Sequence, residues 1–267
     1  MILKTIFQQA LMFSGRIFGF AIVFFIFLVT IYYLYTKKIV PIRPLPQVEA
    51  MREGVGRCAE MGKPLLFNYG NPTQGMDYWT VAGLNLLRFT AEVAAPAGVK
   101  LIVPLSGTPK SLITHAVVKD IVKNVCEAAG TPELYNEANF RLTGTDDPTW
   151  ALAVYRILYE TNPGAHYFLG FQTGYNVLFG EAGNDLGCLS IGSSFYMAQI
   201  AFSVITSDYT FINQDLVAAS AYVSKDPNQG GFLRAIDVNT FLMILLIMIG
   251  SILMTGGNNV IQWIMGV

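Results

Sequence analysis

The sequence contains little charge. Only 13% of its 267 residues are Asp, Glu, Lys or Arg, whereas 53% are hydrophobic, and the formal net charge is -1. An average soluble domain carries roughly 25% charged residues. High hydrophobicity with low net charge excludes an intrinsically disordered chain. Because no excess of Lys and Arg is available to neutralise phosphates, the composition also argues against a nucleic-acid partner.

Cysteine and histidine are scarce as well. Cys58, Cys126 and Cys188 are far apart and odd in number, which is not the pattern of a disulfide framework or a zinc site. We expect reduced thiols, most of them buried. His115 lies within a predicted helix and His166 at the start of a predicted strand, both awkward places for a catalytic triad or a metal site. We therefore expect structural histidines, no metal and no cofactor.

The glycine motifs of nucleotide-binding and hydrolytic enzymes are missing, although the chain has 25 glycines. Residues 105–111 (LSGTPKS) do not match GxxxxGK[ST], and no GxGxxG follows the first predicted strand. Residues 191–194 (IGSS) lack the second glycine of a GxSxG elbow. The sequence thus carries no catalytic signature, and an enzyme is the less favoured interpretation.

Two long apolar segments lie near the ends of the chain. Phe18–Tyr35 contains no charge and approaches the roughly 20 residues that cross a bilayer. Phe241–Thr255 is shorter and would be a marginal span unless its helix continues through Gly256 and Gly257. We predict two transmembrane helices; a signal peptide and a buried core helix are the respective alternatives. Residues 1–15 are either an interfacial helix or the lead-in to the first span.

The basic residues predict how these spans are oriented. Positive charge favours the cytoplasmic side of a membrane. Only Lys4 and Arg16 precede the first span, whereas five basic residues follow it closely: Lys37, Lys38, Arg43, Arg52 and Arg57. We therefore expect a two-span protein of the cell membrane whose central domain is cytoplasmic and whose termini are both extracytoplasmic.

The central part of the chain alternates short apolar runs with helical patterns. Six strands are expected, at 64–69, 99–105, 140–143, 166–171, 188–192 and 209–212. The intervening helices are expected at 48–62, 77–95, 108–130, 147–160, 195–207 and 215–223, with Thr108 and Asp147 as caps before a proline. Such alternation implies right-handed crossovers, and therefore an α/β fold with a three-layer, mostly parallel, Rossmann-like sheet.

The expected organisation follows from these segments. Residues 1–36 form an N-terminal segment and transmembrane helix, and residues 37–47 form a Pro-rich, extended linker. Residues 48–238 form the α/β domain, and residues 239–267 form the C-terminal transmembrane helix and tail.

Polar residues gather after the predicted strands. In an open parallel sheet, ligands bind outside the carboxyl ends of the strands. The candidate ligand-binding residues at this edge are Asn68, Ser106, Thr108, Asp146, Gln172 and Ser193. Helix N-termini and backbone N–H groups there would suit a small polar or anionic ligand. The same residue types also cap helices and form turns, and the sequence favours that interpretation. No catalytic residue is assigned.

Four stretches of the chain resemble a membrane family of bacteria and archaea that is known only as a domain of unknown function, DUF6754. The stretches are Met51–Glu53, Ala59–Pro64, Asp208–Thr210 and, as the most specific, Ala218–Pro227 (AASAYVSKDP). The resemblance implies a membrane-anchored α/β module and carries over no catalytic residue.

Two functions remain open. The first is a self-associating scaffold or structural component of a membrane complex, because a domain with so little charge and many aromatic residues has the composition of an interface. Its partners would be further copies of the chain and other membrane-complex subunits. The alternative is a membrane-tethered enzyme or small-ligand sensor that uses the polar loops at the carboxyl ends of the strands.

Overall fold

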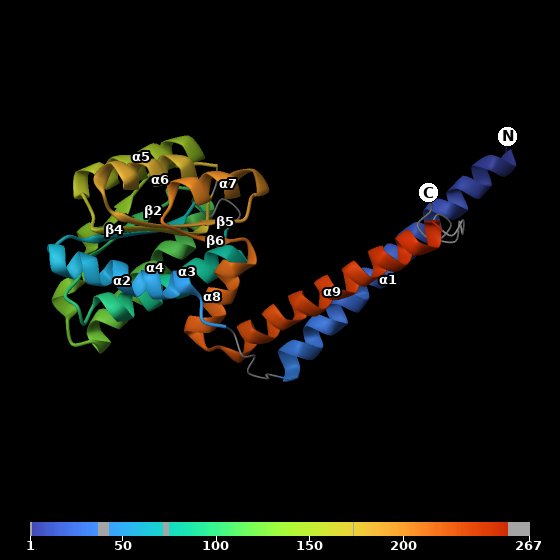
Figure 1. The fold of residues 1–267 in the computed structure, drawn as a ribbon, viewed down its shortest axis with the longest axis horizontal. Helices are drawn as coiled ribbons and strands as arrows, with labels where there is room; N and C mark the ends of the chain where they lie inside the picture. The colour runs from blue at the N-terminus through green and yellow to red at the C-terminus, as the bar shows by residue number, and fades with distance from the viewer. Residues whose placement is uncertain (1, 37–42, 72–74, 173, 256–267) are drawn as a thin grey trace. The chain divides into compact units, whose positions relative to one another are not determined.

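Six parallel strands form one sheet with the order β3-β2-β1-β4-β5-β6. The computed structural model describes residues 2–36, 43–71, 75–172 and 174–255 (Figure 1). The strands are β1 (Leu65–Gly70), β2 (Leu101–Leu105), β3 (Phe140–Leu142), β4 (Ala165–Phe171), β5 (Leu189–Ser194) and β6 (Tyr209–Ile212). Every pair of neighbours is parallel, which confirms the predicted α/β fold.

Helices cover both faces of the sheet (Figure 1). One face carries α2 (Pro46–Met61), α3 (Tyr78–Ala94), α4 (Leu112–Ala128) and α8 (Gln214–Ser224). The other face carries α5 (Asp147–Thr161), α6 (Asn176–Leu186) and α7 (Met197–Thr206). Because helices shield both faces, β1, β2, β4 and β5 are buried along their whole length. These strands therefore read as continuous runs in the sequence rather than as alternating patterns.

The core under α5 and α6 is aromatic. Trp150 and Phe179 meet edge to face with ring centroids 5.4 Å apart, and Phe168 of β4 packs against both helices. Trp150, Phe168 and Phe179 are fully buried. All three cysteines are free and buried, as expected. Burial raises the pKa of Cys58 and of Cys188 to about 11 and also raises that of Cys126.

Two predicted helix caps are wrong. Thr108 makes no side-chain capping bond, because Pro109–Ser111 forms a short 3-10 turn and α4 begins only at Leu112. Asp146 rather than Asp147 caps α5, since its carboxylate accepts from the backbone N–H of Thr149. The sequence pattern Asp-Asp-Pro allows either aspartate to precede the helix, and the proline occupies the second helical position instead of the first.

The apolar terminal segments form a unit of their own, consisting of residues 1–41 and 225–267, whereas residues 42–224 form the α/β unit. Helix α1 (Ile2–Thr36) runs without interruption and packs along α9 (Pro227–Thr255). Gly231 permits close approach, because a Cβ there would lie 2.7 Å from Tyr33 O. Windows of 18 residues within Gly19–Thr36 and Pro227–Ile252 have mean hydropathies of 2.0 and 2.1, so both helices could span a membrane.

Some expectations for this unit fall on residues outside the described ranges. These include most of the Pro-rich linker and the continuation of the second span through Gly256 and Gly257. Residues 2–15 belong to the same continuous helix as the first span. Helix α9 begins at Pro227, so it includes the exposed charged residues Arg234 and Asp237 before its apolar part.

Candidate functional site

The sheet reverses its direction of winding between β1 and β4. The chain first builds β2 and β3 on one side of β1, and then crosses back to place β4, β5 and β6 on the other side. The connections that leave the carboxyl ends of β1 and β4 therefore diverge, toward α3 on one face and α6 on the other. Such a switch point is where doubly wound sheets bind ligands. We call the carboxyl ends of β1 and β4 the switch-point edge.

Two buried amides meet at the switch-point edge. Asn68 Oδ1 accepts from Gly70 N at 3.0 Å, and Gln172 Nε2 donates to Asn68 O at 3.3 Å. These bonds determine which way each amide points. Asn68 Nδ2 and Gln172 Oε1 find no hydrogen-bond partner among the residues that the structure describes. An unpaired buried polar atom costs about 1–3 kcal/mol, so both atoms favour a partner beyond the described residues.

A second polar cluster is centred on Ser106, directly after β2. The Ser106 hydroxyl donates to Asn71 Oδ1, and Asn71 Nδ2 donates to Asp147 Oδ1. Thr108 Oγ1 lies 3.1 Å from the Ser106 hydroxyl, and His115 Nε2 lies 2.6 Å from Ser106 O. The cluster joins the ends of β1 and β2 to the first turn of α5. Because these groups satisfy one another, they form a structural network.

The other two predicted site residues bond elsewhere. Asp146 is occupied by its capping bond to Thr149. Ser193 lies inside β5 and not in the loop after it; its hydroxyl donates to Phe168 O at 3.3 Å and accepts from Gly170 N at 3.2 Å. The structure therefore brings together Asn68 with Gln172, and Ser106 with Thr108, but it does not gather all six residues around one point.

Sequence reasoning missed Asn71 and Asn176. Asn71 follows Gly70 immediately and is completely buried. Asn176, at the start of α6, donates to Ser193 O at 2.9 Å and to Ser203 Oγ at 2.7 Å. Both asparagines directly follow a strand or begin a helix, which is the same signal that marked Asn68.

His166 lies on β4 away from the switch-point edge, as its sequence position predicts. It is fully buried beside Phe168 and Phe179, with ring centroids 5.1 and 6.1 Å away. Neither ring nitrogen has a partner among the described residues. Burial lowers the pKa of His166 to about 3. Over the described part of the chain, no three His, Cys, Asp or Glu residues gather as a metal site.

Helix α7 carries an apolar surface that faces outward. Its described residues contain no charge, and the exposed side chains include Met197 and Ile205, at 87% and 78% exposure. The buried face consists instead of Ser203 and Thr206. Thr206 packs against Gly180 of α6, where a Cβ would collide with its hydroxyl, so only small side chains fit between these helices. We call the exposed residues Tyr196, Met197, Phe202, Val204 and Ile205 the α7 face.

A row of aromatic rings continues from the α7 face toward α3. Tyr78 and Trp79 have centroids 4.6 Å apart, Trp79 stacks on Phe195 at 5.0 Å, and Phe195 lies 4.3 Å from Tyr196. Tyr78 and Tyr196, at the two ends, are exposed. Rings held in this way lose little conformational entropy when they contact a partner.

Comparison with known proteins gives one match. A family model described as a domain of unknown function, DUF6754, matches residues 7–265, which includes both apolar helices and the whole α/β unit. No curated protein and no solved structure matches. Because the match covers nearly the entire sequence, the chain belongs to the DUF6754 family.

Proposed function

We propose that this chain is a membrane-anchored module whose α/β unit assembles with further copies of itself into a scaffold. The observation that carries the proposal is the α7 face, whose apolar side chains are exposed while Ser203 and Thr206 of the same helix are buried. Large exposed apolar patches on folded proteins mark interaction sites. Met and aromatic residues, which dominate this face, are enriched in interface cores.

Anchoring in a membrane strengthens this argument. Two apolar helices on each chain confine the copies to one plane, so their effective concentration rises and weak contacts suffice for assembly. Copies that share one membrane normal close into cyclic arrangements by default. We therefore expect an assembly larger than a dimer, in which the α7 face of one copy contacts a different surface of the next copy.

Native mass spectrometry of the full chain in mild detergent tests this proposal. The wild type should give assemblies larger than a dimer, and Ile205→Glu should weaken them by about tenfold or more, because it buries a charge in an apolar contact. Leu152→Glu is the matched control, since Leu152 is an exposed residue of α5 outside the α7 face (62% exposed). A monomeric wild type, or equal losses in the two variants, would contradict the proposal.

A small-ligand sensor is the second candidate function. It is supported by the unpaired Asn68 Nδ2 and Gln172 Oε1 at the switch-point edge. The same spectra provide its test: a bound small molecule should add mass to the wild type, and Gln172→Leu should lose that mass. If the mass is absent from the wild type, or is unchanged in the variant, the sensor is excluded.

The orientation of the module in the membrane is also part of the proposal. In a chain whose three native cysteines are replaced by alanine, single cysteines at exposed Glu133 and at Asn258 would be treated with a membrane-impermeant maleimide on intact cells. We expect labelling at position 258 and none at position 133, because basic residues flank the inner ends of the spans. Permeabilised cells, in which position 133 must react, are the control. Labelling at 133 in intact cells would place the α/β unit outside.

A further inference from the structure

A groove with a volume of about 470 Å³ opens at the opposite edge of the sheet, where the strands begin. Its walls come from the turns before β1 and β2, from β3 and from the end of α5. Volumes of 300–1,000 Å³ are typical of small-molecule sites. The groove lies wholly within the α/β unit and contains none of the residues discussed above as a candidate site.

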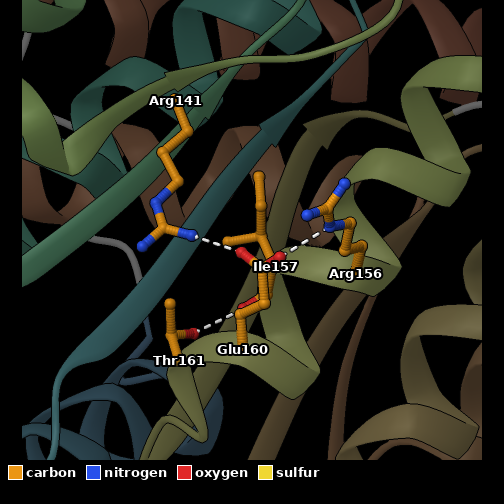
Figure 2. A network of polar contacts seen from close by, with 5 residues as sticks. All are labelled: Arg141, Arg156, Ile157, Glu160 and Thr161. Atoms are coloured by element: carbon orange, nitrogen blue, oxygen red, sulfur yellow. Dashed lines mark hydrogen bonds and ion pairs between the residues drawn. The ribbon is translucent and has the colours of Figure 1, made fainter.

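The charged groups of this groove are predominantly positive. Lys63, Lys100 and Arg141 line it, with Glu160 as the single carboxylate among its lining residues. Glu160 is already paired twice, at 2.6 Å from Arg156 Nε and 2.9 Å from Arg141 Nη1 (Figure 2). The hydrogen bond from Arg156, and then the charge and bond of Arg141, lower the pKa of Glu160. Its carboxylate is thus ionised and already paired with two guanidinium groups. It therefore does not neutralise the two lysines.

Both lysines line the groove from the segments that lead into β1 and β2. Leu65 of β1 is in register with Leu101 of β2, and Lys63 and Lys100 lie two residues and one residue before this pair. Neighbouring strands are about 4.8 Å apart, so a ligand bound across the two segments is within reach of both long side chains. Lys63 Nζ donates to the neutral Asn162 Oδ1 at 2.9 Å. Within the described ranges, Lys100 makes no ion pair.

Helix ends neutralise only part of this positive charge. Helices α2, α3 and α5 end at Met61, Ala94 and Thr161, near the groove, and a helix C-terminus carries roughly half a negative charge. Three such ends offset at most about one and a half of the two ammonium charges. The lining residues of the groove therefore retain a net positive charge.

We propose that this groove binds a small molecule bearing a carboxylate or phosphate group, held between Lys63 and Lys100. Each ammonium group supplies charge-assisted hydrogen bonds to the anion. Cys58 also lines the groove, but its side chain is buried and burial raises the pKa of its thiol to about 11, so the thiol stays protonated at neutral pH. The site is accordingly one for binding rather than for thiolate chemistry, and it is independent of self-association.

Isothermal titration calorimetry tests the site, with citrate and inorganic phosphate as probes. The full chain is used in detergent at constant ionic strength. A free anion as ligand predicts saturable binding of at least one probe. A lipid headgroup as the source predicts instead that short-chain phosphatidic acid binds and that neither citrate nor inorganic phosphate does. If none of the three binds above a chloride control, the proposal is overturned.

Substitutions locate the binding that is observed. Replacing Lys63 and Lys100 together by alanine should weaken the probe by about tenfold or more, because two charge-assisted contacts are lost. Lys123→Ala is the matched control, since Lys123 is an exposed lysine of α4 that does not line the groove. If Lys123→Ala weakens binding of the probe equally, the effect comes from general surface charge, and the proposed site is overturned. Unchanged melting temperatures without probe show that the variants are folded.

Discussion

The free energy of unfolding should fall steadily as the pH is lowered from 6.5 toward 3, and His166→Leu should remove most of this loss. In the unfolded chain His166 takes up a proton at its ordinary pKa of 6.5, whereas in the folded chain burial lowers that pKa to about 3. Between these values only the unfolded state is protonated. Acid therefore favours unfolding. The contribution of neutral His166 to the free energy of unfolding is fully present only above pH 6.5.

The expected size of this effect is on the order of 1.4 kcal/mol per pH unit below 6.5. At neutral pH, His166→Leu should be neutral or stabilising, because two buried ring nitrogens that have no partner among the described residues are replaced by an apolar group of similar volume. Melting temperatures of wild type and variant across pH 4–8 measure the difference, so the titration of carboxylates common to both cancels.

His115→Leu is the matched control for this prediction. His115 Nε2 lies 2.6 Å from Ser106 O, so its removal should destabilise the chain at neutral pH and leave the acid-dependent loss in place. A His166→Leu chain that loses stability in acid as steeply as the wild type would show that His166 is not the group that titrates.

The second large effect is expected at Gly170. Its φ of 117° lies in a region that side chains avoid, and a Cβ there would collide with Tyr69 O on the neighbouring strand. The collision is with backbone, which cannot move aside without separating β1 from β4. Gly170→Ala should therefore cost about 3 kcal/mol or more, or lower the melting temperature by roughly 10 °C.

Gly187→Ala separates the cost of the positive φ from the cost of the collision with the neighbouring strand. Gly187 also has a positive φ, of 63°, but open space surrounds its missing Cβ. We expect a loss of only about 1 kcal/mol from backbone conformation alone. Similar melting temperatures for the two alanine variants would mean that the close approach of β1 and β4 contributes little to stability.

The strands and helices of the α/β unit could be predicted because each buried parallel strand is a short apolar run between turn residues. The prediction failed where hydroxyl residues continue a strand. Ser193 and Ser194 look like a loop in the sequence, yet they complete β5 because β6 pairs with both positions. A serine hydroxyl that bonds backbone across strands, as Ser193 does, gives no apolar signal.

The grouping of the site residues could not be predicted, because it depends on strand order. Asn68 and Gln172 are far apart in the sequence and meet only because β4 returns to lie beside β1. The sequence also does not show which side of α7 is exposed. Its composition is that of a buried helix, and the structure shows that Ser203 and Thr206 face inward, since Thr206 packs on Gly180 of α6 and Ser203 accepts a hydrogen bond from Asn176. The lysines of the groove likewise line one pocket because β2 pairs with β1, which brings together the segments that precede the two strands.

The burial of the three thiols makes each of them a reporter of local opening. Cys58 of α2 and Cys188 of the turn before β5 lie close enough to interact electrostatically, whereas Cys126 belongs to α4, so the thiols sample two separate parts of the α/β unit. A protonated thiol inside a packed core does not react with alkylating reagents. Alkylation must then wait for a fluctuation that exposes the sulfur. The relative alkylation rates at the three positions therefore rank how often the native unit opens locally at each of them. No foreign probe has to be introduced.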